Sequence, residues 1–250
     1  MDPRAAPGFA YDVIGVGYGA RRRPDPRLAT AIHQALGPGT RLVNVGAGAG
    51  SYEPADRSVV AVEPSEVMLA QHPGSRRVRG VAEKLPFADR AFDVALAVLT
   101  VHHWADPLAG LGELRRVARR QVVFTWDPDH EPKLWITRDY VPAIDALETG
   151  RFAPLSRVVE ALGAHTVVPF EIPHDLTDGF QAAFWRRPEM YLDPSVRAAS
   201  STFASLPPEV VEPGIRRLGD DLESGRWYDR YSDLVTRDRM DYGYRIVIAG

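Results

Sequence analysis

Three glycines alternate in the stretch VNVGAGAG, at Gly46, Gly48 and Gly50, directly behind the apolar run 42–45. Glycine has no Cβ, so its backbone N–H groups can approach a charged ligand closely. When such a loop follows a strand and leads into a helix, the helix N-terminus adds favourable electrostatics. The stretch therefore predicts a loop that binds a charged cofactor.

The spacing of these glycines argues against a nicotinamide cofactor. That cofactor requires the pattern G-x-G-x-x-G followed by a long helix that receives a pyrophosphate. Here the pattern is G-x-G-x-G, and Pro54 in the following segment SYEPADRS leaves room for two helical turns at most. A second triplet, GVGYG at 15–19, follows no apolar strand and is not assigned as a phosphate loop.

A carboxylate, Glu63, ends the next apolar run, VVAV at 59–62. At the carboxyl end of the second strand of such a sheet, a carboxylate can accept hydrogen bonds from both hydroxyls of a ribose. This arrangement serves any adenosine cofactor. We therefore predict that Glu63 binds the ribose.

The elements that must position these residues are strands and crossovers. Near-continuous apolar strands separated by helical connections are typical of a parallel sheet covered on both faces. The expected strands are 41–45, 59–62, 77–81, 92–98 and 121–126, and the expected helices are 64–72 and 106–118.

After Trp126 the alternation breaks. The pattern predicts helices over 133–149 and 156–163, a strand over 165–172, a mainly helical stretch from 178 to about 225, and a final strand in YGYRIVIAG. A long helical insert between two strands predicts a cap above the sheet, where specificity is built. We expect four parts: a lid segment at 1–40, a cofactor-binding core at 41–130, remaining core elements with the cap at 131–240, and the last strand at 241–250.

With the segment VAEKLPFADRAFDVALAV (81–98) and the dipeptide at 102–103, the chain resembles the class I S-adenosylmethionine-dependent methyltransferases, in particular the small-molecule group similar to methyltransferase type 11. Their glycine-rich motif matches NVGAGAG, their acidic ribose ligand matches Glu63, and their fourth-strand motif matches 93–103. The resemblance implies an α/β, Rossmann-like fold of seven strands with helices on both faces. It also implies that the last strand is antiparallel and lies between strands five and six, and that the cofactor is S-adenosylmethionine.

The same resemblance implies a set of cofactor contacts. Gly46, Ala47 and Gly48 are expected against the methionine moiety and Met68 on the adenine, while Glu83, or a backbone amide beside it, bonds the adenine edge. The full expected set is Tyr11, Tyr18, Gly46, Ala47, Gly48, Gly50, Glu63, Pro64, Met68, Ala82, Glu83, Leu99 and Thr100.

Three features keep alternatives open on the cofactor side. Tyr11 and Tyr18 either contact the cofactor or pack in an ordinary lid, and the arginines at 21–23 either bind the cofactor carboxylate or are solvated. Asn44 stands where the family often has an acidic residue before the glycines. That difference removes a charged contact to the amino group of the cofactor.

His102 and His103 follow the fourth strand in AVLTVHHWADP, near the expected methyl acceptor. Two roles stay open: acid or base chemistry, or bracing of the helix that begins near Asp106. A metal site is not expected, because no third ligand has suitable spacing. Aromatic residues in 180–194 and 225–234 are either a substrate wall or ordinary helix packing.

Composition limits the function classes. The chain has no cysteine, which excludes thiolate nucleophiles and cysteine metal sites. Its formal net charge of -3 gives no electrostatic footprint for nucleic acid or an anionic membrane, and no apolar stretch of about 18 residues occurs. We expect a soluble, cytoplasmic protein, as a monomer or a homodimer.

The expected activity is methyl transfer from S-adenosylmethionine to an oxygen, nitrogen or carbon atom of a small molecule in specialised metabolism. In-line displacement of a cationic leaving group depends mainly on alignment, so a base is needed only where the acceptor must lose a proton. The alternative is a binding or pericyclic scaffold of the same fold that keeps the cofactor without transferring methyl groups.

Overall fold

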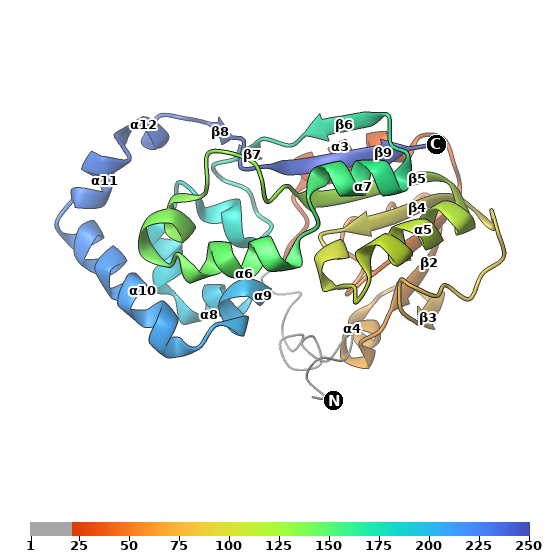
Figure 1. The fold of residues 1–250 in the computed structure, drawn as a ribbon, viewed down its shortest axis with the longest axis horizontal. Helices are drawn as coiled ribbons and strands as arrows, with labels where there is room; N and C mark the ends of the chain where they lie inside the picture. The colour runs from red at the N-terminus through yellow and green to blue at the C-terminus, as the bar shows by residue number, and fades with distance from the viewer. Residues whose placement is uncertain (1–21) are drawn as a thin grey trace.

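The core is a seven-stranded sheet with the order β3-β2-β1-β4-β5-β9-β6 (Figure 1); the computed structural model describes residues 22–250. Strands β1 to β5 are parallel, and β9 lies antiparallel between β5 and β6. The α/β fold and the place of the last strand are therefore confirmed. The bounds are β1 Arg41–Val45, β2 Ser58–Glu63, β3 Arg77–Arg79, β4 Phe92–Val98, β5 Ala118–Trp126, β6 Thr166–Pro169 and β9 Tyr244–Ala249.

Both faces of this sheet are buried, because alternate residues of a strand point to opposite sides. In β4, Val94 and Leu96 belong to the apolar cluster that contains α3, whereas Ala95 and Ala97 belong to the cluster that contains α5 and α7. The sequence therefore needs apolar residues at nearly every central strand position. The helix bounds are α3 Pro26–Leu36, α5 Pro107–Val117 and α7 Leu155–Leu162.

Helix α3 lies within the segment expected to be a lid. Asp25 caps the helix by accepting a hydrogen bond from the Arg27 backbone N–H, and a proline at the first helical position fixes where it begins. Leu28 and Ile32 are fully buried against the sheet. Tyr11 and Tyr18 lie outside the described residues, so their roles stay predictions.

Most of the remaining helices form a cap that occupies the left part of Figure 1, with the sheet on the right. Its interior is aromatic: the ring of Trp135 lies 5.2 Å from that of Trp227, and Trp185, Tyr191 and Tyr231 are also buried. Packing is therefore the role of most of the cap aromatics. The bounds are α6 Ala143–Arg151, α8 Pro194–Ala198, α9 Ser201–Ser205, α10 Pro208–Glu223, α11 Arg226–Arg230, α12 Ser232–Val235, and the short helices η3 Ile136–Tyr140, η4 Gln181–Phe184 and η5 Pro188–Leu192.

Two predicted elements are wrong in their bounds. The single helix over 133–149 is divided into the π-helical turn η3 and helix α6, because Pro142 has no N–H to continue the helix. The single strand over 165–172 is β6 followed by β7 (Ile172–Pro173), which pairs with β8 (Arg239–Met240) in a separate small sheet. Pattern alone does not show that a continuous apolar run changes sheets.

Candidate active site

A cavity of about 920 Å³, counted with its open mouth, lies at the carboxyl ends of β1, β2 and β4. The strand order reverses between β1 and β4, which is where open parallel sheets bind ligands. The predicted residues that line it are Gly46, Ala47, Gly48, Glu63, Pro64, Met68, Ala82, Glu83, Leu99, Thr100 and His103. We call this space the cofactor cavity.

The glycine loop has the backbone that only glycine adopts without strain. Gly46 has φ 70°, and a Cβ there would lie 1.9 Å from Thr100 Oγ1. Gly48 has φ 55°, and a Cβ would lie 3.3 Å from the Cε atom of Met68. Gly50 also has positive φ, but it packs beside His72 and does not line the cavity. The first two glycines thus bring backbone to the cavity, whereas the third shapes the loop.

Glu63 closes this loop onto the end of β2. Its carboxylate accepts hydrogen bonds from the backbone N–H of Gly48 and of Ser65, each at 3.0 Å. Ser65 in turn caps α4 (Glu66–Gln71), which carries Met68 into the cavity. Glu63 is 6% exposed and lines the cavity, so one carboxylate fixes the loop and faces the ligand space.

Asn44 tests whether the cavity suits the amino acid end of S-adenosylmethionine. Its Nδ2 donates to Glu53 Oε1 at 2.9 Å, and His72 contacts the same oxygen at 3.0 Å. Since the amide nitrogen must face that carboxylate, the orientation of the amide is fixed. Asn44 Oδ1 is then buried with no partner among residues 22–250, and Asn44 lines the cavity. This neutral acceptor fits an ammonium group, so the residues present fit the cofactor.

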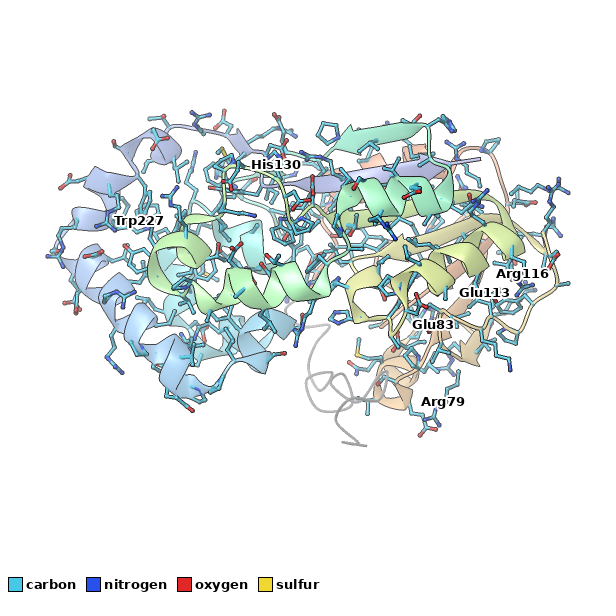
Figure 2. The ribbon with its side chains drawn as sticks, viewed as in Figure 1. Arg79, Glu83, Glu113, Arg116, His130 and Trp227 are labelled. Carbon is cyan, nitrogen blue, oxygen red and sulfur yellow. The ribbon has the colours of Figure 1, made fainter. Side chains whose placement is uncertain are left out.

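Helix α5 holds the segment expected to contact adenine. Glu83 lines the cavity, and its Oε1 accepts a hydrogen bond from the Asp106 backbone N–H at 3.0 Å. The Leu85 N–H donates to Glu113 at 2.8 Å, and Arg116 donates to the Leu85 carbonyl at 3.0 Å. Figure 2 shows Glu83 beside α5, with Glu113 and Arg116 further along that helix. The carboxylate of Glu83 is therefore engaged with the protein, which favours a backbone contact to adenine.

His102 and His103 lie in a short helix, η2 (Val101–His103), directly after β4 and Leu99. His103 lines the cofactor cavity, whereas His102 does not and instead stacks on Phe152 with ring centroids 4.0 Å apart. Burial, with added repulsion from Arg151, lowers the pKa of His103 to about 3, and burial likewise lowers the pKa of His102. Both imidazoles are neutral near pH 7. This arrangement suits packing for His102 and hydrogen bonding to an acceptor for His103.

We expect His103 to make the fold less stable in mild acid. Its pKa is about 3 in the folded chain and near 6.5 in an unfolded chain, so between these values only the unfolded state binds the proton. Stability therefore falls as pH drops below about 6.5. From about pH 7 to about pH 5, wild type should lose about 2 kcal/mol more than His103→Asn, measured by urea unfolding. If the free energies of unfolding of wild type and His103→Asn change in parallel with pH, His103 is hydrated in the folded protein and the prediction is wrong.

A buried network joins the chain before α3, the glycine loop and the cap. Arg22 forms an ion pair with Asp178 through both carboxylate oxygens, and the Tyr52 hydroxyl donates to Asp178 at 2.7 Å. Both Arg22 and Tyr52 line the cofactor cavity. Sequence analysis missed Tyr52 and Asp178, which lie far apart in the chain. Of the arginines considered for the cofactor carboxylate, Arg22 is already paired and Arg23 is exposed.

Glu63→Ala should weaken binding of S-adenosylhomocysteine by about 1.5–3 kcal/mol, or one to two decades in Kd, because it removes a charged acceptor from the cavity. The measurement is isothermal titration calorimetry, with the melting temperature recorded to separate loop loosening from lost ligand contact. Glu66→Ala is the matched control, since Glu66 is exposed and its partner is Arg79 on the surface. An unchanged Kd for Glu63→Ala would show that Glu63 does not contribute to ligand binding.

Within residues 22–250, no three His, Asp or Glu side chains are grouped so that they could hold a metal ion. No helix in that same range is both long and apolar enough to cross a membrane.

Comparison with known proteins adds three likenesses. Residues 43–125 match the methyltransferase domain family. A putative methyltransferase from an antibiotic biosynthesis pathway of Anabaena variabilis is 35% identical, with a TM-score of 0.84 over 92% of this chain and 99% of that one. The [4+2]-cyclase SpnF, at 18% identity and a TM-score of 0.54 over 97% of this chain and 96% of that one, shows the fold alone.

A curated relative, the uncharacterized methyltransferase YcgJ of Bacillus subtilis, is 28% identical over 120 residues, which are 43% of this chain and 47% of that protein. The chain spans about half the length of the curated relatives it matches. The likeness to the Anabaena protein, in contrast, extends over both chains nearly completely.

Proposed function

This chain belongs to the class I S-adenosylmethionine-dependent methyltransferases, and we propose that it methylates a small molecule of specialised metabolism. The observation that carries the proposal is a second cavity that adjoins the cofactor cavity. The two share Arg22, Leu99 and His103 as lining residues. A molecule in the second cavity would therefore lie next to the place where a methyl group is carried.

The second cavity, which we call the acceptor cavity, has a volume of about 450 Å³. This volume includes its open mouth. The cavity lies between the carboxyl end of β4, helix α6 and helix α9, a position that suits a small molecule. The Anabaena relative, a putative methyltransferase from an antibiotic biosynthesis pathway, supports a role in specialised metabolism. The further lining residues are His102, Glu148, Phe152, Phe180, Gln181, Ala199, Ser200, Ser201, Thr202 and Tyr244.

When bound, S-adenosylmethionine would supply a methyl group that the acceptor atom attacks in line, with S-adenosylhomocysteine as the leaving group. The protein contributes by positioning the reacting groups. Leu99 has φ 48°, a conformation rare for a non-glycine residue, and its N–H donates to the Phe124 carbonyl at 2.8 Å. Leu99 is thereby held at the junction of the two cavities. The neutral imidazole of His103 can accept a hydrogen bond from an acceptor hydroxyl or amine.

Product analysis tests this proposal. The protein is incubated with S-adenosylmethionine that carries a trideuteriomethyl group and with a panel of aromatic alcohols, amines and activated carbon acids. Mass spectrometry should find S-adenosylhomocysteine and one product that carries the labelled methyl group. Conversion of a substrate to an isomer, without label in the product and without S-adenosylhomocysteine, would instead favour the pericyclic scaffold. The [4+2]-cyclase SpnF shares the fold.

A further inference from the structure

Glu148 is a buried carboxyl group at the end of the acceptor cavity. It is 8% exposed, on α6, and it lines both the acceptor cavity and a third cavity of about 400 Å³. The third cavity shares no lining residue with the cofactor cavity. Glu148 therefore marks the far end of the acceptor cavity, whereas Leu99 and His103 mark the near end.

The hydrogen bonds that Glu148 accepts come from neutral groups. Thr202 Oγ1 donates to Oε1 at 3.0 Å, and Gln181 Nε2 donates to Oε2 at 3.5 Å. Among residues 22–250, no Lys, Arg or His side chain forms an ion pair with Glu148. Burial, together with the charge of Asp145 on the same helix, raises the pKa of Glu148 to about 7, against the opposing effects of its hydrogen bonds and of the charge of Arg151. A positive group beside it would stabilise the carboxylate.

The walls near Glu148 are aromatic. Phe180 and Tyr244 have ring centroids 4.8 Å apart, and Trp126 and Phe152 have ring centroids 5.1 Å apart. Phe152, Tyr244 and Glu148 line the acceptor cavity and the third cavity alike. Aromatic faces attract cations and also stack on flat rings. The far end of the cavity therefore combines a negative group with surfaces that suit a flat ring.

One polar atom in the same cavity has no hydrogen-bond partner among the described residues. Nδ1 of His102 is buried without a hydrogen bond to any of residues 22–250. His102 is neutral near pH 7, so it does not supply the positive charge that Glu148 lacks. Both groups are open to a polar ligand.

We propose that Glu148 is the anchor for a protonated amine on the methyl acceptor. The ammonium group lies at Glu148, a flat apolar body lies between Phe152 and Tyr244, and the atom that receives the methyl group points toward Leu99 and His103. The ammonium itself is not methylated. This inference rests on the proposed function and names the class of its substrate: an aromatic compound with a basic amine at one end and a nucleophile at the other.

The test uses three probes of similar shape and different charge: 2-phenylethylamine, 2-phenylethanol and 3-phenylpropanoate. Each is titrated by calorimetry into the full chain saturated with S-adenosylhomocysteine. Wild type should bind the amine at least tenfold more tightly than the alcohol, and the carboxylate least. Glu148→Gln should weaken the amine at least tenfold and leave the alcohol and S-adenosylhomocysteine unchanged. Glu160→Gln, the same change at an exposed residue of α7, should alter none of these affinities.

Several results would overturn the anchor. These are no amine binding at millimolar concentration, equal affinity of wild type for amine and alcohol, preference for the carboxylate, or undiminished amine binding by Glu148→Gln. The wild-type comparison decides the matter even where the variant fails to fold. Labelled methyl transfer to acceptors without an amine would leave the proposed function intact while rejecting the anchor, whereas failure to bind S-adenosylhomocysteine would reject the function itself.

Discussion

Gly46→Ala is expected to abolish useful cofactor binding. The new Cβ would lie 1.9 Å from Thr100 Oγ1 and 2.7 Å from Thr100 Cβ, and the residue would keep a φ near 70°. Left-handed backbone costs an L-residue about 1–2 kcal/mol, and overpacking costs about 1–3 kcal/mol more. Because binding requires this loop conformation, the Kd for S-adenosylhomocysteine should rise about a hundredfold or more, measured by calorimetry.

The control is Gly112→Ala in α5, where a Cβ meets nothing within 4 Å. Alanine is favoured over glycine in a helix by about 0.5–1 kcal/mol, so this variant should melt no lower than wild type and bind the cofactor normally. Wild-type affinity in Gly46→Ala would mean that the loop moves away from Thr100 at no cost. The cavity geometry given above would then not be the binding geometry.

Asp178→Ala should cause the largest loss of stability. Asp178 is 1% exposed and accepts hydrogen bonds from Arg22 and Tyr52, both in largely buried positions. Removing one member of a buried ion pair typically costs about 3–5 kcal/mol, because the other charge keeps its desolvation penalty. For a chain of this size that corresponds to a fall in melting temperature of about 10 °C. Calorimetric or spectroscopic melting measures it.

Asp175→Ala provides the comparison for that variant. Asp175 is 59% exposed and pairs with Arg27 on the surface, and exposed ion pairs contribute about 0–1 kcal/mol. A second comparison, Tyr52→Phe, removes one hydrogen bond to Asp178 and should cost about 1 kcal/mol. If Asp178→Ala and Asp175→Ala have the same melting temperature, the buried network does not stabilise the contact between the glycine loop and the cap.

The cofactor cavity is the part of the site that local sequence predicts well. Gly46 and Gly48 have positive φ where the chain turns directly after β1, and Glu63 ends a strand in which the four preceding residues are apolar. Each of these features depends on a few residues that are close in the chain. The carboxyl ends of parallel strands lie at the same end of the sheet, so the positions of these residues at strand ends are enough to predict that they lie together.

The acceptor cavity does not follow from local pattern. Glu148 lies in the helical stretch AIDALETGR, where a glutamate is ordinarily exposed, and it becomes buried only because Thr202 and Gln181 approach from segments that lie further along the chain. Tyr244 reaches the same cavity from the last strand. These contacts arise from the tertiary packing of the cap, which local sequence patterns do not predict. Asp178 was missed for the same reason.

The histidine pair shows an intermediate case. Position after β4 predicts that both histidines lie near the methyl acceptor. In the structure His103 lines the cofactor cavity, whereas His102 faces Phe152. The distinction arises from the turn of η2, which sends adjacent side chains to different cavities. A base role for either histidine stays a prediction, and their lowered pKa values make both weak bases.

Calorimetric titration with S-adenosylhomocysteine, run beside NAD, tests the central claim most directly. The account predicts one site per chain for S-adenosylhomocysteine, no heat with NAD, and a stabilisation of about 2.7 kcal/mol at a hundredfold excess of ligand over Kd. Glycine spacing, the carboxylate of Glu63 and Asn44 Oδ1, which has no partner among residues 22–250, all favour that result. Binding of NAD with none of S-adenosylhomocysteine would contradict the assignment of the cavity and of the reaction.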